Sequence, residues 1–391
     1  MLAALEAHVP ALRTAALREP LGLYLHLPFC RDRCTYCSFV TTRDETLKPA
    51  VLARLRGQVA DWGRALGRPA LDTLYLGGGT PSLLEAGELA ELTGAVAGAF
   101  ALDGLEEATL EANPGTLDRP WLEAARALGW NRISLGVQTL DDGLLARLGR
   151  IHDSRAALEA LGWARAVFDR VSADLMVGIP GQDLDRVLGD ARRLVQAGAN
   201  HLSVYLLDLD KACPLKGQVA SGKLTLPSDD EAADVFEALQ EELPRLGLRP
   251  YEISNYAAPG QASRHNNRYW ERRPYLGLGP SAASQLGEWR WSESPVIPAW
   301  IEGRGSAEVQ HLDPAEALAE IPLLGLRMHQ GVDWEQLRAR GRALHLEPLV
   351  DAWEAQLAPF FQYGLLLREG PWLRFTPKGM LLSNGVLQIF V

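Results

Sequence analysis

Three closely spaced cysteines are the residues of this chain best suited to chemistry. Cys30, Cys34 and Cys37 form a C-x3-C-x2-C pattern in the stretch GLYLHLPFCRDRCTYCSF, on a loop after an apolar, strand-like run. Three thiolates on one loop can bind three irons of a [4Fe-4S] cluster, whose full ligand set would be four. The only other cysteine, Cys213, is distant in the sequence. One iron would therefore keep an open coordination position, where a metal site can bind a reactant.

Other interpretations of these cysteines stay open. Cys34 and Cys37 alone could form a redox-active C-x-x-C pair, but Cys30 would then have no role. A zinc site would need a fourth ligand, and His26 in the strand-like run is the only candidate nearby. The thiols could also be unreactive, as buried cysteines often are, although a polar loop with two arginines is an unusual place for them. We favour the cluster.

The composition narrows the class of protein. The chain has 391 residues, 47% of them hydrophobic, so it can bury a large core in two or three domains or in one barrel with an appendage. A net charge of −10 argues against a nucleic-acid-binding surface, and four cysteines do not make a disulfide framework. The start of the chain lacks a signal-peptide pattern, and no apolar run reaches about 18 residues. We expect a soluble cytoplasmic protein that binds no nucleic acid and does not span a membrane.

Short β-rich runs alternate with amphipathic helical stretches over roughly the first 245 residues. The six runs are Leu23–Leu27, Thr73–Leu76, Ala108–Glu111, Arg132–Val137, Val171–Val177 and Leu202–Leu207. Such alternation predicts a parallel sheet with helices outside it. Six βα units are fewer than the eight of a complete barrel, so we expect an α/β fold with a partial (β/α)6 barrel. Capping boxes at Ser82–Glu85 and Ser228–Glu231 mark two helix starts.

The pattern changes after about residue 250. An irregular, aromatic-rich stretch is followed by helical patterns over Pro314–Ile321, Trp334–Arg340 and Leu349–Phe361, and then by a hairpin with a turn at Gly370. Helices followed by a hairpin suggest a small winged-helix-like domain. We therefore predict three parts: a barrel over 1–250 with the cluster and its reactant, an extension over 251–305 that contains HNNRYW, and a C-terminal α+β domain over 306–391.

Polar residues end several of the predicted strands, where parallel sheets bind their ligands. Gly77–Thr80 follows the second run but lacks the lysine of a Walker loop, so it offers bare backbone that a ligand can approach closely, or else a tight turn. Glu111 suits an ammonium or ribose hydroxyl, and buried Gln138 and Asp174 would need a polar partner. Arg150 could bind a carboxylate with two donors, or be solvated. The alternative for each strand end is that loops are polar because they are exposed.

These stretches together carry a resemblance to a known family. The C-x3-C-x2-C spacing resembles the radical S-adenosylmethionine (SAM) superfamily, in which SAM chelates the open iron. LYLHLPFC, YLGGGTPS, LEANPGT, RISLGVQTLDDGLLARLGRIH, DLMVGIPGQ, YEISNYA and RHNNRYW are more narrowly similar to the HemN/HemW family of oxygen-independent coproporphyrinogen III oxidases and heme chaperones. The resemblance covers about residues 20–285 and, more weakly, the remainder. It implies a [4Fe-4S] cluster bound by Cys30, Cys34 and Cys37, and SAM contacts from Tyr24, Gly78, Gly79, Thr80, Glu111, Gln138, Arg150 and Asp174.

Two features favour the heme-chaperone branch of this family. The oxidase has a further cysteine two positions after the third, where this chain has Phe39, and a longer segment ahead of the motif. The sequence His265-Asn-Asn-Arg-Tyr-Trp270 matches the H-N-x-x-Y-W motif of the chaperones. The resemblance thus implies heme binding and delivery to recipient hemoproteins, with porphyrinogen decarboxylation as the alternative. A third hypothesis is an interaction protein whose cluster is structural. A homodimer is compatible with all three.

The axial ligand of the heme iron stays open. Imidazole is the commonest such ligand, and His265 lies among Tyr269, Trp270 and Tyr275 in the sequence, which could pack against a porphyrin. The alternative is that HNNRYW is a structural loop whose histidine and asparagines satisfy backbone groups. Cys213 is a weaker candidate for a thiolate ligand, because nothing in its surroundings positions it.

Overall fold

A large mixed β-sheet carries most of the fold in the computed structural model, which describes residues 2–211, 213–304 and 308–391. Its strands are β1 (Leu21–Leu27), β2 (Leu71–Gly78), β3 (Glu107–Ala112), β4 (Arg132–Gln138), β5 (Arg170–Val177), β6 (His201–Leu206), β7 (Arg249–Pro250), β8 (Asn255–Ala257), β9 (Tyr275–Leu278), β10 (Ala283–Leu286), β11 (Trp289–Ser292) and β12 (Glu308–His311). They lie in the order β12-β11-β10-β9-β1-β2-β3-β4-β5-β6-β8-β7.

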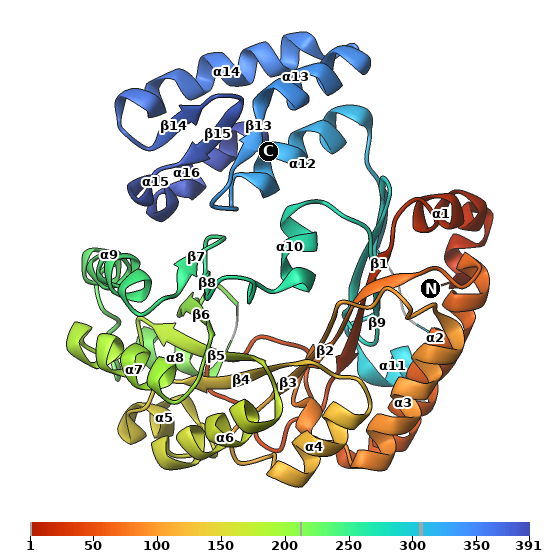
Figure 1. Ribbon diagram of the computed structural model, residues 1–391, viewed down its shortest axis with the longest axis vertical. Coiled ribbons are helices and arrows are strands. Elements are labelled where there is room, and N and C mark those ends of the chain that lie inside the picture. Colours follow the sequence, from red (N-terminus) through yellow and green to blue (C-terminus); the bar gives the residue numbers. More distant parts are fainter. Residues whose placement is uncertain (1, 212, 305–307) are drawn as a thin grey trace.

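Strands β1 to β6 form the parallel part of this sheet and confirm the predicted α/β partial barrel. Each strand overlaps one predicted run, and no end differs from its predicted position by more than two residues. Helices cover the outer face of the curved sheet (Figure 1). They are α2 (Lys48–Leu66), α3 (Ala86–Ala99), α4 (Arg119–Ala127), α5 (Asp142–Leu148), α6 (Ser154–Val167), α7 (Leu184–Gln196), α8 (Pro214–Ala220) and α9 (Asp229–Arg245).

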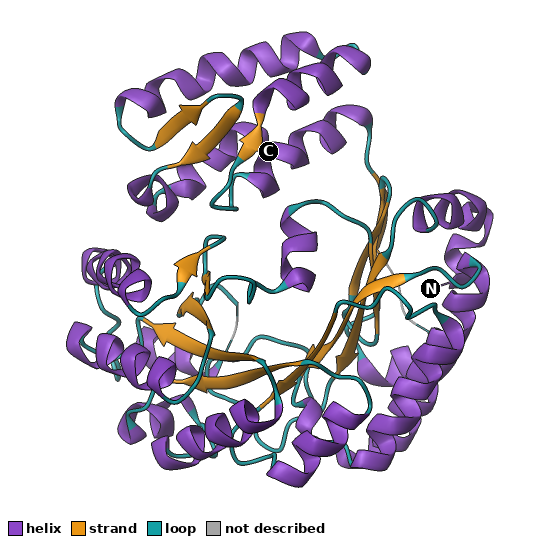
Figure 2. Cartoon of the chain, in the orientation of Figure 1, coloured by secondary structure: helices purple, strands orange, loops and turns teal. Residues whose placement is uncertain are grey.

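Additional strands extend both edges of the parallel sheet. Strand β8 runs antiparallel to β6, and β9 runs parallel to β1 and continues through the antiparallel strands β10 to β12. These strands are short and rich in aromatic residues, so the period-two pattern that reveals a strand is weak in them. The result is an open arc of strands with helices outside (Figure 2). Helix α10 (Arg264–Trp270) lies on its concave side (Figure 1).

Capping residues confirm one predicted helix start and correct the other. Ser228 caps α9 and forms the predicted reciprocal box with Glu231. The predicted start at Ser82 is wrong, because Pro81–Leu83 form a 3-10 turn and α3 begins at Ala86. Its box is formed by Glu85 and Glu88 instead. The glutamate at the third position of the predicted box is itself the cap, so a capping pattern three residues further along was the correct one.

The C-terminal part confirms the predicted small α+β unit. Helices α12 (Pro314–Gly325), α13 (Trp334–Ala343) and α14 (Glu347–Gln362) precede a hairpin of β14 (Leu366–Glu369) and β15 (Trp372–Phe375), which pairs with β13 (Val332–Asp333). A separate hydrophobic core includes Trp334, Trp353 and Phe375. A β-bridge between Glu252 and Met328 joins this unit to the barrel. The division at residues 250 and 305 remains a prediction, and β12 still pairs with β11.

Candidate functional site

The cluster loop is closed at its base by backbone hydrogen bonds. The Cys30 amide donates to the Thr42 carbonyl at 3.0 Å, and the Thr42 amide donates to the Pro28 carbonyl at 2.7 Å. Further along, the Thr35 amide donates to the Leu148 carbonyl at 3.0 Å, which ties the loop to the end of α5. The loop between β1 and α2 is therefore held at the carboxyl end of the sheet, where parallel strands place their ligands.

The three predicted cluster ligands line one cavity of about 340 Å3 at this end of the sheet. All three are free cysteines. The Thr80 hydroxyl lies 3.6 Å from Cys30 Sγ, and Arg150 Nη1 lies 3.4 Å from Cys34 Sγ. Burial raises the pKa of the Cys30 thiol to about 11, so binding of a metal there would release a proton. Donors beside the sulfurs and a shared cavity fit a set of thiolate ligands.

The zinc alternative depends on the side chains that surround the cysteine loop. Among the residues that the structure describes, no three side chains of cysteine, histidine, aspartate or glutamate converge on a point where one metal ion could be held. A zinc ion needs such convergence, whereas each thiolate of an iron–sulfur cluster binds a different iron. The predicted fourth zinc ligand is also engaged: His26 Nε2 donates to the Val40 carbonyl at 3.0 Å, and Nδ1 accepts from the Tyr24 hydroxyl at 3.0 Å. The arrangement favours the cluster.

The predicted glycine contacts, Gly78 and Gly79, line the cavity because β2 passes very close to β1. A Cβ atom on Gly79 would lie 2.5 Å from the Phe29 carbonyl oxygen. Gly78 has φ of +106°, and a Cβ there would meet the His26 ring at 2.5 Å. The glycine run is therefore both a tight turn and a stretch of bare backbone that a ligand in the cavity can approach closely.

Glu111 lines the same cavity as the cysteines and is held by two donors. The Tyr75 hydroxyl donates to its Oε1 at 2.7 Å, and the Gly78 amide donates to its Oε2 at 3.0 Å. Burial raises the pKa of this carboxyl group, and the two hydrogen bonds oppose that effect. The carboxylate can also face a bound ligand, because Glu111 lines the same cavity as the thiols.

Arg150 lies in the cavity wall rather than on the outer surface. Its Nη2 donates to Asn113 Oδ1 at 2.6 Å and to the Gly136 carbonyl, while Nη1 points at Cys34. Its Nε is buried and without a partner among the described residues. The guanidinium is thus positioned by neighbouring strand ends, and it places a positive charge beside the thiols and the cavity, where an anionic group would be attracted.

Gln138 and Asp174 complete the polar wall. Gln138 ends β4 with φ of +75°, an uncommon backbone conformation for a residue other than glycine, and it is buried against the cavity. Burial, and next the nearby Glu111 carboxylate, raise the pKa of Asp174 to about 7. Two carboxyl groups and the buried Gln138 therefore line the same cavity.

Six of the eight predicted SAM contacts line the cavity, namely Gly78, Gly79, Glu111, Gln138, Arg150 and Asp174. Thr80 faces Cys30 and lines a small adjoining hollow. Tyr24 is outside the lining, and its hydroxyl is used by His26. Sequence reasoning missed Tyr75, Asn113 and Tyr36. Tyr75 and Asn113 flank motif residues on β2 and after β3, and that proximity was the only available signal.

His265 is part of a buried network and lies away from the cavity. Its Nδ1 shares a hydrogen bond of 2.9 Å with Thr73 Oγ1, and its Nε2 shares one of 2.8 Å with the Tyr269 hydroxyl. Burial, and next Arg268, lower the pKa of the ring to about 3. Neither nitrogen could bind iron without losing a partner. These contacts support the structural alternative for HNNRYW rather than axial ligation by His265.

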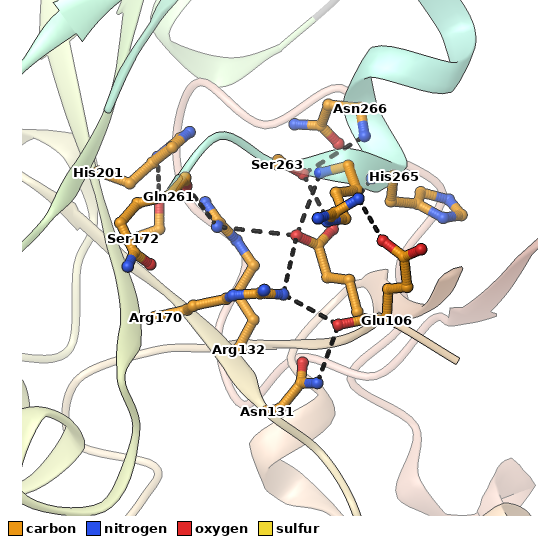
Figure 3. Close-up of polar contacts among 12 residues, drawn as sticks. Glu106, Asn131, Arg132, Arg170, Ser172, His201, Gln261, Ser263, His265 and Asn266 are labelled. Carbon is orange, nitrogen blue, oxygen red and sulfur yellow. Dashed lines mark hydrogen bonds and ion pairs between the residues drawn. The ribbon is translucent and has the colours of Figure 1, made fainter. Parts of the chain in front are cut away.

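Helix α10, which contains this motif, is fastened to the amino end of β3. The buried carboxylate of Glu107 accepts from the amides of Arg264 at 3.1 Å and His265 at 2.9 Å, at the start of the helix. Arg132 and Arg170 converge on the same place from β4 and β5 (Figure 3). The motif therefore closes the end of the sheet opposite the cysteines, and its histidine is one of the closing residues.

Cys213, the other cysteine, precedes α8 and does not line the cavity. It packs against a small apolar group that includes Leu144, Met176 and Leu215. Among the described residues, no helix is both long enough and apolar enough to cross a membrane.

Comparison with known proteins agrees with the fold and the loop. The Radical SAM superfamily matches residues 24–194, and the HemN C-terminal domain matches residues 312–382. Coproporphyrinogen III oxidase (HemN) from Escherichia coli has the same fold, with a TM-score of 0.84 and 22% identity over 97% of this chain and 93% of that chain. A parallel sheet with a three-cysteine loop at its carboxyl end is thus a radical SAM scaffold.

Two full-length relatives narrow the family. Heme chaperone HemW from Mycobacterium tuberculosis (strain ATCC 25618 / H37Rv) is 35% identical over 95% of this chain and 94% of its own length. Radical S-adenosyl methionine domain-containing protein 1, mitochondrial, from Mus musculus is 33% identical over 97% of this chain and 88% of its own length. The chain belongs to the HemN/HemW family of radical SAM proteins. Membership implies a [4Fe-4S] cluster and SAM.

Proposed function

We propose that this protein is a heme chaperone that binds heme and delivers it to recipient hemoproteins, on a scaffold that carries a [4Fe-4S] cluster and SAM. The observation that best supports this proposal is the position of Phe39 in the cavity. Its side chain lines the cavity beside Cys37 and is 66% exposed. An oxidase of this family would have a cysteine at this position, so the cavity combines a SAM site with an apolar group where the oxidase has a thiol.

The cluster would be held by Cys30, Cys34 and Cys37 on the loop that follows β1. Its open iron would supply a coordination site for the amino and carboxyl groups of SAM. Arg150 and Glu111 line the same cavity, with charges that suit a carboxylate and an ammonium respectively. Two further predicted contacts, Gln138 and Asp174, are hydrogen-bonding groups suited to ribose hydroxyls.

Relatives that carry the name heme chaperone support the delivery role, because they match nearly the whole length of this chain. The competing function is oxygen-independent coproporphyrinogen III oxidase. The polar residues that line the cavity favour that alternative, since a carrier of heme has no evident need for them. The two functions differ in what they do to a tetrapyrrole, so they can be separated directly.

One experiment on the full chain separates them. The cluster is reconstituted without oxygen, and the protein is then given SAM with coproporphyrinogen III and, separately, heme. We expect a heme-induced Soret band at a stoichiometric heme:protein ratio and no protoporphyrinogen. Formation of protoporphyrinogen would overturn the proposal in favour of the oxidase. The absence of a heme-induced Soret band would also overturn the proposal, because the protein would then not bind heme. A Phe39→Cys variant serves as a matched test of whether this position alone blocks turnover.

A further inference from the structure

Tyr75 connects the buried motif helix to the predicted SAM site. It lies on β2, two residues before the glycine run. On one side its ring lies 5.1 Å from the His265 ring, measured between centroids. On the other side its hydroxyl donates to Glu111 Oε1 at 2.7 Å. One side chain therefore contacts both the end of the sheet that α10 closes and the wall of the cavity.

The support behind Tyr75 is unusually well fixed. The start of α10 is held by the Glu107 carboxylate, and His265 is held by Thr73 and Tyr269. Arg268 is fully buried and donates to the Pro274 carbonyl at 2.9 Å and to Thr73 Oγ1 at 3.1 Å. Buried side chains with both polar ends bonded have little rotamer freedom, so the His265 ring is a rigid surface for the phenol.

The hydroxyl of Tyr75 has a specific effect on the carboxylate it contacts. Glu111 has two oxygens, and the Gly78 amide occupies Oε2 at 3.0 Å. With Tyr75 on Oε1, the carboxylate is held in one orientation, in which it bridges β2 and β3 below the glycine run. Hydrogen bonds to an ionised carboxylate are short and strong. Loss of one would free the group to rotate and would leave it less able to stay ionised.

We propose that Tyr75 is a positioning residue for SAM: its hydroxyl orients the Glu111 carboxylate, and α10 holds the phenol in place. This inference rests on the proposed SAM site. It assigns to the HNNRYW helix a role in support of the cavity, although the helix lies at the other end of the sheet. Tyr75 itself touches neither the thiols nor the cavity mouth among the described residues.

The pH dependence of SAM binding tests this role, because a purely structural role of Tyr75 would not change the pKa of Glu111. Burial raises its pKa, while Tyr75 and Gly78 lower it. The other titratable groups that face it are Tyr24 from β1, Asp174 from β5, Tyr205 from β6 and Tyr269 from α10. Removal of the Tyr75 hydroxyl therefore raises the pKa of Glu111 further, so the ionised form disappears at a higher pH.

The experiment measures SAM affinity of the anaerobically reconstituted protein at several pH values between 6 and 8. Tyr75→Phe is compared with Tyr269→Phe, which removes a phenol hydroxyl from the same His265 contact without touching Glu111. We expect Tyr75→Phe to weaken SAM binding roughly tenfold at pH 6, as for a lost hydrogen bond to a charged group, and to weaken it less at pH 8. Tyr269→Phe loosens the His265 ring but keeps the hydrogen bond between Tyr75 and Glu111, so it should weaken SAM binding less and leave the pH dependence as in wild type.

Three outcomes would overturn the inference. The first is a wild-type pH profile in Tyr75→Phe. The second is an equal loss in both phenylalanine variants, because that would indicate general loosening of the buried network. The third is additivity of Tyr75→Phe and Glu111→Gln in the double variant. If Tyr75 acts through Glu111, Tyr75→Phe should have little further effect on SAM binding once Glu111 is glutamine.

The proposed SAM site and the role of Tyr75 fail in distinguishable ways. If the wild-type protein binds no SAM, the site proposal fails. If it binds SAM and Tyr75→Phe behaves like Tyr269→Phe, only the inference fails. The electron paramagnetic resonance spectrum of the reduced cluster, recorded with and without saturating SAM, adds a readout at the metal. We expect Tyr75→Phe to keep the spectrum without SAM and to need more SAM for the spectral change.

Discussion

Arg150 Nη1 lies 3.4 Å from the sulfur of Cys34, although 116 positions separate the two residues in the chain. The contact brings a loop after β1 and a loop after α5 to one cavity. The same guanidinium donates to Asn113 and to the Gly136 carbonyl, so it is held by three different strand-end segments. This geometry makes Arg150 the first residue to test.

Replacement of Arg150 by alanine should leave the cluster in place and weaken SAM binding by about tenfold or more, because a charge-assisted donor is lost. Isothermal titration of the reconstituted protein measures the affinity, and the broad iron–sulfur absorption reports the cluster. Arg186→Ala is the control, since Arg186 pairs with Asp141 and Asp183 on the surface. Equal SAM affinity in the two variants would rule out a role for Arg150 in binding.

Replacement of Cys34 by alanine should abolish the broad iron–sulfur absorption after anaerobic reconstitution, because the two remaining thiolates are too few to hold the cluster. Cys213→Ala is the matched control, since Cys213 lies outside the cavity, and its iron content should equal that of wild type. Retention of the cluster in Cys34→Ala, or its loss in Cys213→Ala, would show that the ligand set is wrong.

Replacement of His265 by alanine should destabilise the fold without changing heme binding. The Thr73 and Tyr269 hydroxyls would lose a buried partner, at a cost of about 2 to 3 kcal/mol in the free energy of unfolding. Urea denaturation gives the stability and a heme titration gives the Soret band. A stable variant without the Soret band would instead identify His265 as the axial ligand.

The same histidine should make stability depend on pH. Burial lowers its pKa in the folded protein to about 3, whereas the unfolded chain takes up a proton near pH 6.5. The unfolded state therefore binds more protons as the pH falls below about 6.5, and stability decreases. Wild type should lose more stability than His265→Gln between pH 7 and pH 5, as measured by urea denaturation. Parallel pH curves for the two proteins would contradict the assignment.

Replacement of Glu107 by glutamine should destabilise the fold by about 3 to 5 kcal/mol, the typical cost of breaking a buried charge pair. Arg132 would keep its charge without an acidic partner, and both side chains are almost completely buried. Glu106→Gln is the neighbouring control, because Glu106 pairs with Arg264 at the surface, where such a change costs at most about 1 kcal/mol. Similar melting temperatures for the two variants would mean that Glu107 does not anchor α10.

The sequence predicted the parallel part of the fold because its strands are buried on both sides and read as short apolar runs between helical patterns. Strands β9 to β11 escaped prediction, since each is only four residues long, too short to show a sustained alternation of apolar and polar residues. Their strand character comes from pairing with β1 and with one another, which is a tertiary effect. The predicted helix start at Ser82 was wrong for a local reason. Glu85 and Glu88 form a second possible capping box three residues further along, and the helix uses that one.

The sequence predicted those residues of the cavity lining that belong to recognisable motifs. Gly78, Glu111, Arg150 and Asp174 belong to that group. Tyr24 was attributed to the SAM site by resemblance and stays a prediction, with its hydroxyl bonded to His26 Nδ1 at 3.0 Å. Tyr75 was missed for the opposite reason: its residue type is common in strands, and only the distance to Glu111 distinguishes it from an ordinary core aromatic.

The closed base of the cysteine loop has a consequence for how the protein matures. The bonds that close it, between Cys30 and Thr42, Thr42 and Pro28, and His26 and Val40, join backbone or imidazole atoms and use no sulfur. Classical zinc fingers, by contrast, gain their fold from the metal. We therefore expect the polypeptide to fold before it acquires iron and sulfide, so that a shortage of iron leaves a folded chain without a cluster.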